Sequence, residues 1–303
     1  MKIWGHCRFS YFGFSDTGRE IGTLDSAFAK LWHPVRMAVR FHLMETILLP
    51  ALRAQTDPDF SFVITTSQVM PDLYHERLAQ ITADIPQVTI LRSAFTDLSK
   101  ALKPAMRHAS ADYTEPAVHF RVDDDDAVSA DYVARLRKAS AKVDPGGMIT
   151  FPTGVVGFLD NGAARHAMFY KHSIAIGLAL VATAKSPRQP FRIQHVRHSA
   201  SVPSYTDPTF PAYHYTLHSV NNTAGYGQLF HVDPTQRKRI QALLAQNKEL
   251  AAGGMETAKA ARALATAFPH TTGDTLRFAI ARSGDPMALA EEMGFPTEAF
   301  TAP

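Results

Sequence analysis

Four consecutive aspartates, Asp123 to Asp126, directly follow an apolar segment that ends at Val122. Adjacent carboxylates repel one another, so a compact chain keeps them ordered only with a cation or hydrogen-bond donors close by. Such oxygen ligands suit Mg²⁺ or Mn²⁺, which take one or two protein carboxylates and complete their shell with water and substrate phosphates. The run therefore predicts a metal–diphosphate site, because ligands bind at the carboxyl ends of strands in α/β sheets.

The alternative is a solvated acidic turn that caps a helix beginning near Ser129, where carboxylates are also favoured. Both interpretations place the aspartates at the end of a strand predicted over residues 117–122. A cap needs one carboxylate and not four, which favours the metal–diphosphate interpretation.

Strand and helix patterns alternate along the first half of the chain. Segments rich in β-branched and aromatic residues predict strands, and apolar residues at spacings of three and four predict helices. This βαβαβαβ order predicts an α/β fold with a mostly parallel sheet and helices on both faces. The expected strands are 2–8, 60–65, 88–91, 117–122 and 148–151, and the expected helices are 35–54, 72–84, 98–109 and 129–142.

The pattern changes after residue 151. Residues 152–162 indicate a strand and a loop, and Gly177 leaves helix and strand open for 173–184. Residues 185–230 show little periodicity, and long irregular segments inside a compact domain tend to be functional loops. The rest of the chain is typical of helices, at 235–252, 256–267, 274–281 and 286–293.

Composition narrows the class of protein. The 303 residues carry a formal net charge of +3, too small to argue for nucleic-acid binding. Cys7 is the only cysteine, which excludes an intrachain disulfide and fits a reducing compartment. The chain begins without the apolar region of a signal peptide, and its longest apolar stretch, 174–182, is far shorter than the roughly 20 residues that span a bilayer. We therefore expect a cytoplasmic protein with at most peripheral contact at the inner face of a membrane.

Two blocks of the sequence resemble nucleotide-sugar glycosyltransferases of the GT-A fold. In the block 40–78, P-A-L-R-A-Q-T precedes the strand pattern F-S-F-V-I-T, as P-S-L-x-x-Q-T precedes the second strand of these enzymes. The block 121–136, R-V-D-D-D-D-A-V-S-A-D-Y-V-A-R-L, resembles their L-D-x-D-D-x-x-x-x-D-Y-L metal motif. Bacterial rhamnosyltransferases, with an Arg before an Asp-rich run, are the most similar set.

The resemblance implies a domain organisation. A GT-A-like domain would cover residues 1–232, with a nucleotide-binding half at about 1–127 and an acceptor-side half at about 128–232. A C-terminal helical extension, 233–303, would follow, and it matches no family pattern.

The resemblance also implies roles within the acidic run. Asp123 matches the aspartate that contacts ribose or sugar hydroxyls, and Asp125 matches the metal ligand. Asp126 would orient a metal-bound water, and Asp124 would point away from the sheet axis as a bystander. Arg121 shares its side of the strand with Asp123, so it would pair with a carboxylate in a structural ion pair or bind the donor diphosphate.

Further donor contacts are expected after the first two strands. Arg8, with His6 and Ser10, would border the nucleotide base, and Thr66, with Thr65 and Ser67, would line the same crevice. The alternative for the residues of the first strand is ordinary surface polarity.

Histidines and one aspartate complete the candidate site. His218, with His214 as the second candidate, matches the downstream histidine that gives the metal a further ligand in many GT-A enzymes, although a lone histidine in a loop is more often a surface or packing residue. Asp207 is the only carboxylate between Asp160 and Asp233, so it is the candidate base, or else an Asx turn before Pro208. The pair His195 and His198 would bind diphosphate or form a basic surface loop.

The expected activity is transfer of a sugar from a nucleoside diphosphate donor to a glycan or lipid-linked acceptor, with Mg²⁺ or Mn²⁺ and an inverting mechanism. One alternative is another metal-dependent phosphate enzyme such as a nucleotidyltransferase. Such an enzyme would have a glycine-rich phosphate loop near its first strand, and Gly13 and Gly18 are too scattered to form one. The other alternative is a non-catalytic module that binds carbohydrate or a cation such as Ca²⁺.

Overall fold

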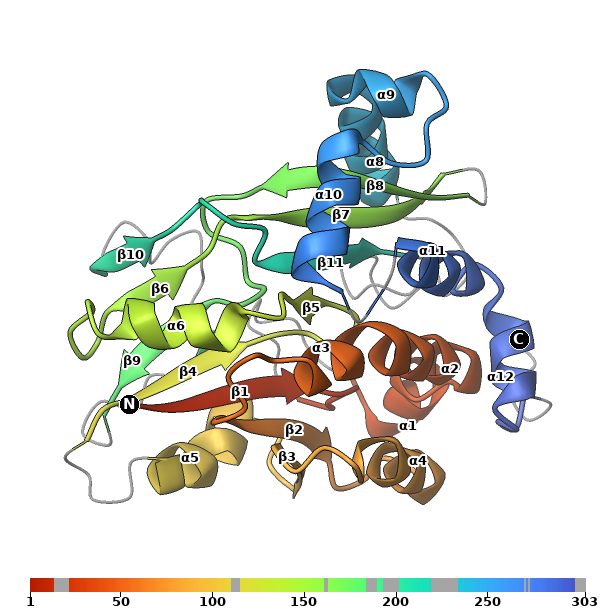
Figure 1. The fold of residues 1–303 in the computed structure, drawn as a ribbon. Helices are drawn as coiled ribbons and strands as arrows, with labels where there is room; N and C mark the ends of the chain where they lie inside the picture. Colours follow the sequence, from red (N-terminus) through yellow and green to blue (C-terminus); the bar gives the residue numbers. More distant parts are fainter. Residues whose placement is uncertain are drawn as a thin grey trace.

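Two β-sheets surrounded by helices make up the fold (Figure 1). The computed structural model describes residues 1–13, 22–109, 115–160, 163–183, 190–192, 202–218, 234–269, 271 and 273–297. Within these residues sheet A has seven strands in the order β10-β6-β9-β4-β1-β2-β3, and sheet B has four in the order β5-β11-β7-β8.

Sheet A is mostly parallel, as the sequence predicted. β4, β1, β2 and β3 run parallel, β10 is parallel to β6, and β9 lies antiparallel between β4 and β6. The segment that the sequence left open contains β9, which follows a turn where Gly177 has a φ of +71°, a conformation that favours glycine. The strands are β1 Lys2–Arg8, β2 Ser61–Ser67, β3 Val88–Ser93, β4 Ala117–Arg121, β6 Met148–Thr150, β9 Ala179–Ala182 and β10 Ser204–Thr206.

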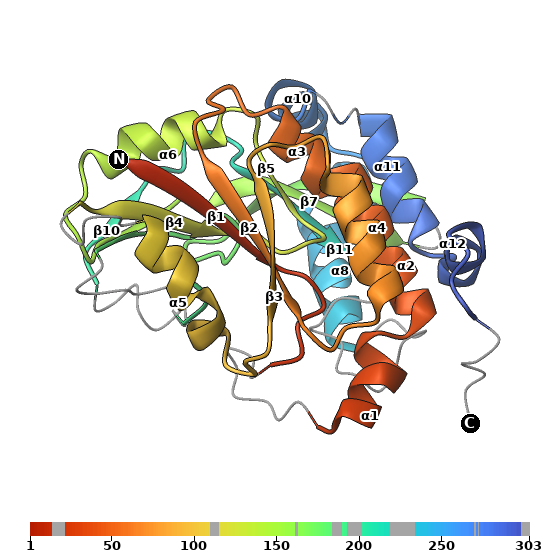
Figure 2. The same cartoon turned by 90° about the horizontal axis from the view of Figure 1, so that it is seen from below.

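Helices cover both faces of sheet A, which confirms that prediction. Alternate side chains of β4 point to opposite faces. Phe120 joins the main core and packs on Tyr132 of α6, whereas Arg121 lies over the ring of Phe191, which packs with α5. Figure 2 shows α6 and α5 on opposite sides of β4. The helices are α1 Leu24–Ser26, α2 Pro34–Leu43, α3 Leu49–Arg53, α4 Asp72–Thr82, α5 Leu98–Ala109 and α6 Tyr132–Ser140, with a 3-10 turn at Pro190–Arg192.

The helix predicted over 35–54 is interrupted by a π-helical turn, Met44–Leu48, between α2 and α3. A second π-helical turn, Ala27–Leu31, follows α1. All ten residues of α2 are buried, so this helix lies in the interior between sheet A and the C-terminal helices.

Sheet B contains strands that the sequence did not predict. β11 is parallel to β7, while β8 pairs antiparallel with β7 and β5 pairs antiparallel with β11. The expectation of irregular structure across 185–230 was wrong for β10 and β11, because neither the short S-Y-T of β10 nor the Y-H-Y-T-L of β11 shows a clear alternation of apolar and polar residues. The strands are β5 Ala127–Val128, β7 Thr153–Asp160, β8 Ala163–Tyr170 and β11 Tyr213–Leu217.

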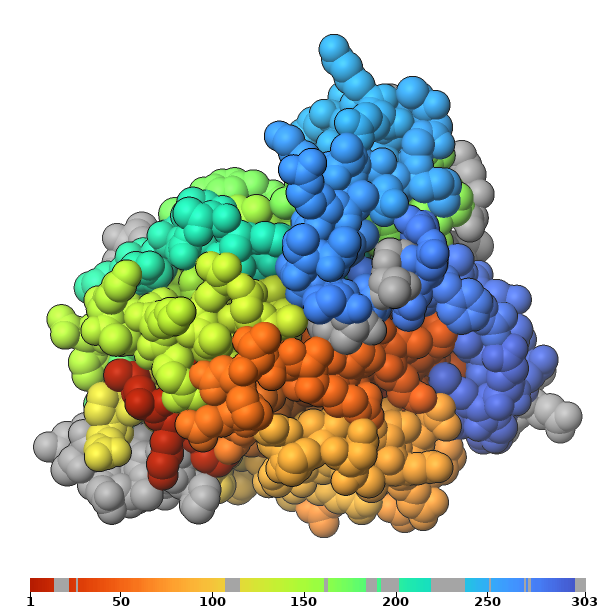
Figure 3. All heavy atoms as spheres, viewed as in Figure 1, coloured from red at the N-terminus to blue at the C-terminus, as the bar shows by residue number. Residues whose placement is uncertain are grey.

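The C-terminal part is helical, as predicted, and it packs on both faces of sheet B. Leu243 of α8 and Leu250 of α9 pack on Val156 and Phe158, while α10 and α11 contact β7 and β8 from the other face. α12 packs against α2 (Figure 3). No helix within the described ranges is both long and apolar enough to cross a membrane. The helices are α8 Pro234–Gln246, α9 Lys248–Ala251, α10 Ala258–Ala267, α11 Gly273–Arg282 and α12 Pro286–Glu292.

Two fully buried histidines stack beneath α10 and α11. The rings of His166 and His214 lie 5.5 Å apart, and their ring nitrogens have no hydrogen-bond partner among the described residues. Gly157 makes room for them, because a Cβ atom there would lie within 3 Å of both rings. Burial, with the charge of Arg277, lowers the pKa of His166 to about 4, and burial, with the charge of His166, lowers that of His214.

We predict that this pair makes the fold acid-sensitive. The unfolded chain binds protons on both histidines below about pH 6.5, whereas the folded chain keeps them neutral, so stability falls as the pH decreases from about 6.5 towards 4. For His166 alone, the free energy of unfolding should be roughly 2 kcal/mol lower at pH 5 than at pH 7. Urea unfolding of His166→Phe at both pH values should show a smaller difference than the wild type. His172→Gln, which changes an exposed histidine, should keep the wild-type difference, and equal differences in all three proteins would contradict the prediction.

Candidate functional site

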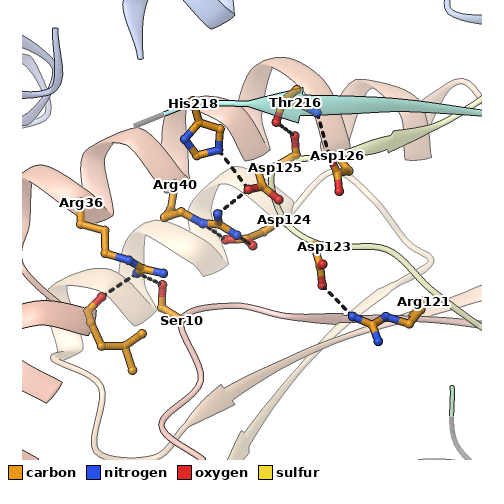
Figure 4. Close-up of polar contacts among 11 residues, drawn as sticks. Ser10, Arg36, Arg40, Arg121, Asp123, Asp124, Asp125, Asp126, Thr216 and His218 are labelled. Carbon is orange, nitrogen blue, oxygen red and sulfur yellow. Dashed lines mark hydrogen bonds and ion pairs between the residues drawn. The ribbon is translucent and has the colours of Figure 1, made fainter. Parts of the chain in front are cut away.

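The four aspartates form a tight turn between the two sheets. Val122 N–H donates to His6 O, which extends the pairing of β4 with β1, and Asp126 N–H donates to Asp123 O across the turn. β5 follows at once in sheet B. Figure 4 shows the side chains of this acidic turn, residues 123–126, and their polar contacts. The turn lines a cavity of about 530 Å³.

A buried arginine on α2 pairs with two of the aspartates. Arg40 Nε donates to Asp124 Oδ2 at 2.7 Å, and Arg40 Nη1 donates to Asp125 Oδ2 at 2.5 Å. All three side chains are almost inaccessible to solvent, at 4%, 1% and 7% exposure for Arg40, Asp124 and Asp125. Asp124 is therefore not a bystander: its carboxylate is a partner of the cation that balances the turn.

Strand β11 supports the turn from the other side. Thr216 N–H donates to Asp126 Oδ1 at 2.9 Å, and Thr216 Oγ1 donates to Asp125 O at 2.6 Å. His218 Nε2 lies 3.0 Å from Asp125 Oδ2. The structure thus brings together Asp125, Asp126 and His218, the three residues that the sequence assigned to a metal.

The surroundings of Asp125 and Asp126 shift the pKa values of the two carboxyls in opposite directions. Burial would raise the pKa of Asp125, but the charge of Arg40 and the hydrogen bond with His218 outweigh it and hold that pKa well below its ordinary value. Burial, reinforced by the charges of Asp125 and Asp123, raises the pKa of Asp126 well above its ordinary value. Burial also lowers the pKa of His218, against the opposing effect of Asp125. Asp125 is therefore the carboxylate that stays ionised.

Asp123 is the most accessible aspartate of the turn. Its side chain is 33% exposed, lines the cavity and lies 3.6 Å from Arg121 Nη2. The guanidinium of Arg121 rests on the ring of Phe191 at 4.6 Å, and that of Arg8 lies 5.2 Å from the same ring. One aromatic ring thus holds two cations beside Asp123.

Other predicted donor contacts serve the protein interior. His6 is buried and hydrogen-bonds His119 on β4 at 2.9 Å. Ser10 has a φ of +43°, and its Oγ accepts a hydrogen bond from Arg36. Thr66 Oγ1 lies 3.4 Å from His75 Nδ1, and none of His6, Ser10 and Thr66 is among the described residues that line the cavity.

Asp207 lies at the end of the edge strand β10. Its Oδ1 accepts hydrogen bonds from Thr209 N–H at 2.9 Å and from Thr209 Oγ1 at 2.6 Å, which is an Asx turn. It is not among the described residues around the cavity, so its position gives no support to a role as base. His214, the second candidate for the ligand histidine, stacks on His166, and His195 and His198 lie outside the described residues.

Arg40 is the site residue that sequence reasoning missed. Arg36 and Arg40 recur at a spacing of four in a helix that is otherwise largely apolar. A cation on a buried helix face needs a carboxylate partner, and this signal could have linked the helix to the acidic run.

A divalent metal fits this site only in part. No group of three or more His, Cys, Asp or Glu in the described ranges is arranged to hold a metal ion. Asp125 and His218 offer an oxygen and a nitrogen 3.0 Å apart, a separation compatible with two neighbouring ligands of one ion. Two protein ligands suffice where substrate phosphates and water supply the others.

We predict that Arg40 is the main electrostatic support of the turn. Arg40→Met leaves Asp124 and Asp125 buried without their cation, and should lower the free energy of unfolding by about 3–5 kcal/mol. Urea denaturation measures this loss. Arg53→Met, which removes an exposed ion pair with Asp84, should cost less than about 1 kcal/mol.

A second variant shows whether the carboxylate causes the loss. Arg40→Met with Asp124→Asn should be more stable than Arg40→Met alone, because one unpaired buried charge is removed. A cost for Arg40→Met no greater than that for Arg53→Met would refute the electrostatic role.

Known proteins were compared with the chain by sequence and by structure. No curated protein matches the sequence. S. aureus TarS 1-349 in complex with UDP-GlcNAc is 11% identical, with 96% of this chain and 91% of that chain covered and a TM-score of 0.44. The chain spans 42% of a longer S. aureus TarS structure, with 11% identity, 81% of this chain covered and a TM-score of 0.38. 4-Diphosphocytidyl-2C-methyl-D-erythritol synthase is 11% identical, with 80% and 96% coverage and a TM-score of 0.32.

A family-wide sequence pattern matches most of the chain. The sequence pattern of the family described as "Putative rhamnosyl transferase" matches residues 2–227. This match contains sheet A, sheet B and the acidic turn, and it ends before α8. Because it covers well over half of the sequence, the chain belongs to the rhamnosyl transferase family and is a glycosyltransferase.

Proposed function

We propose that the protein transfers a sugar from a nucleoside diphosphate donor to a glycan or lipid-linked acceptor, and that it uses Mg²⁺ or Mn²⁺. The observation that carries this proposal is that Arg8, Asp123 and Asp125 line one end of a single cavity, while His218 lies 3.0 Å from Asp125. This end lies at the carboxyl ends of β4 and β1, where ligands bind in α/β sheets.

The donor diphosphate would bind Arg8, which lines the cavity, with the buried Arg121 behind it adding positive charge. Both guanidinium groups pack on Phe191, so Arg8 would lose little side-chain freedom when it binds phosphate oxygens. Asp123, which is partly accessible and beside Arg121, would accept hydrogen bonds from ribose or sugar hydroxyls. These contacts hold the sugar in line for transfer.

Asp125 and His218 would hold the metal, and Asp126 would orient a water of its shell. A bound metal supplies positive charge that stabilises the leaving diphosphate. Arg40 keeps Asp125 ionised, which is the state that a metal ligand requires. Thr216 fixes Asp126 by its backbone N–H and the main chain at Asp125 by its hydroxyl, so both residues are positioned before the donor arrives.

We predict that metal and nucleotide stabilise the protein together. If the diphosphate completes the metal's coordination, Mn²⁺ with UDP, GDP or dTDP should raise the Tm by more than the sum of the separate effects. Asp125→Asn should abolish this synergy while far-UV circular dichroism stays unchanged. Thermal unfolding across the three nucleotides measures the effect, and equal synergy in the wild type and the variant would refute the metal assignment.

Asp207→Asn is the matched control for this experiment. It also removes one carboxylate, but from a turn outside the cavity, so the synergy should remain. The same variant tests whether Asp207 is the general base, because loss of a general base lowers the rate of transfer about 10²–10⁴-fold. We expect nucleotide release from the donor at close to the wild-type rate. A fall of that size would restore Asp207 as the base.

A further inference from the structure

Two cationic side chains that are far in sequence from the acidic turn also line the cavity. Lys171 directly follows β8, and Arg239 lies on α8. Both are exposed, and neither has a carboxylate partner among the described residues. Lys171 and Arg239 line the same cavity, and partial burial of the Lys171 ammonium group, and then the charge of Arg239, lowers the pKa of Lys171.

An apolar wall lies beside these cations. It consists of side chains of sheet B, of the segment between β8 and β9, and of the facing helix α8, and the rings of Phe169 and Tyr215 lie 6.1 Å apart within it. A nucleoside diphosphate has no extended apolar part to cover such a wall. The wall is formed by Val156, Phe169, Ile174, Ile176, Tyr215, Leu217 and Leu243.

Each aspartate of the same cavity already has a partner in the protein. Arg40 pairs with Asp124 and Asp125, Arg121 pairs with Asp123, and Asp126 accepts a hydrogen bond from Thr216. Lys171 and Arg239 take part in none of these contacts. Two neighbouring cations without a carboxylate favour an anion between them, and an exchangeable one must come from a ligand.

We propose that Lys171 and Arg239 bind a phosphate group of the acceptor, whose neighbouring portion lies along the apolar wall. This inference rests on the proposed function, because it assigns the second part of the donor cavity to the acceptor. It also gives α8, which lies beyond the family match, a role in substrate recognition. The phosphate would belong to a lipid phosphate or to a soluble phosphate-bearing glycan.

Binding of small probes tests the proposal directly. Isothermal titration of the full chain, saturated with whichever of UDP, GDP or dTDP binds, would use octyl phosphate, glycerol 3-phosphate and the neutral octyl glucoside. Octyl phosphate should bind at least about tenfold more tightly than octyl glucoside, since a charge-assisted contact with phosphate contributes on that scale. Tighter binding of octyl phosphate than of glycerol 3-phosphate supports a lipid phosphate, and equal binding of the two supports a soluble phosphate.

Variants of exposed residues locate the phosphate. Lys171→Gln and Arg239→Gln should each weaken octyl phosphate binding by about tenfold, and the double variant by about a hundredfold. Lys238→Gln removes the same charge from the adjacent position of α8, which does not line the cavity, and should leave binding unchanged. Nucleotide binding should stay at the wild-type value in all of them.

Three results would overturn the inference. Octyl phosphate binding that is unchanged in the double variant would remove both cations from the site. Nucleotide binding that is lost with the double variant would assign them to the donor diphosphate. Nucleotide binding without binding of either phosphate probe would refute this inference alone, whereas failure of the wild type to bind any of the three nucleotides would refute the proposed function as well.

Discussion

The ion pair between Arg40 and the aspartates of the acidic turn is the interaction on which the site depends. Asp124 and Asp125 are almost completely buried, and burial alone would raise the pKa of Asp125. Arg40 reaches both from α2, and its charge keeps Asp125 ionised. A helix in the first quarter of the chain therefore determines the charge of a turn more than 80 residues away.

The second sheet completes the site from the opposite side. Thr216 and His218 come from β11 and its end, and β11 is held by β7, whose other neighbour is β8. The C-terminal helices pack on both faces of this sheet and so help to fix the position of β11. They contribute to the site in this way although they lie beyond the family match. The cavity between sheet B and α8 is consequently lined both by the acidic turn and by apolar side chains of sheet B and α8.

Helices and strands with a regular hydrophobic pattern were predictable from the sequence, whereas contacts between segments distant in sequence were not. β1, β3, α5 and the main helices appear close to their expected bounds, because their hydrophobic patterns are regular. β11, with the sequence Y-H-Y-T-L, lies in a segment without clear alternation and was missed. Asp207 was chosen because no other carboxylate lay nearby in sequence, but sheet order puts β10 at the edge of sheet A. Thr66 follows the rule for strand ends, yet its side chain turns towards His75 on α4.

Pulsed electron paramagnetic resonance of bound Mn²⁺ tests the central claim most directly, namely that the acidic turn and His218 form a metal–diphosphate site. The wild type with Mn²⁺ and the nucleotide that it binds should show electron spin echo modulation from one histidine nitrogen, together with coupling to the phosphorus of the diphosphate. His218→Ala should lose the nitrogen modulation and keep the phosphorus coupling. Mn²⁺ that binds with no histidine nitrogen in the wild type, or with no phosphorus coupling, would contradict the claim.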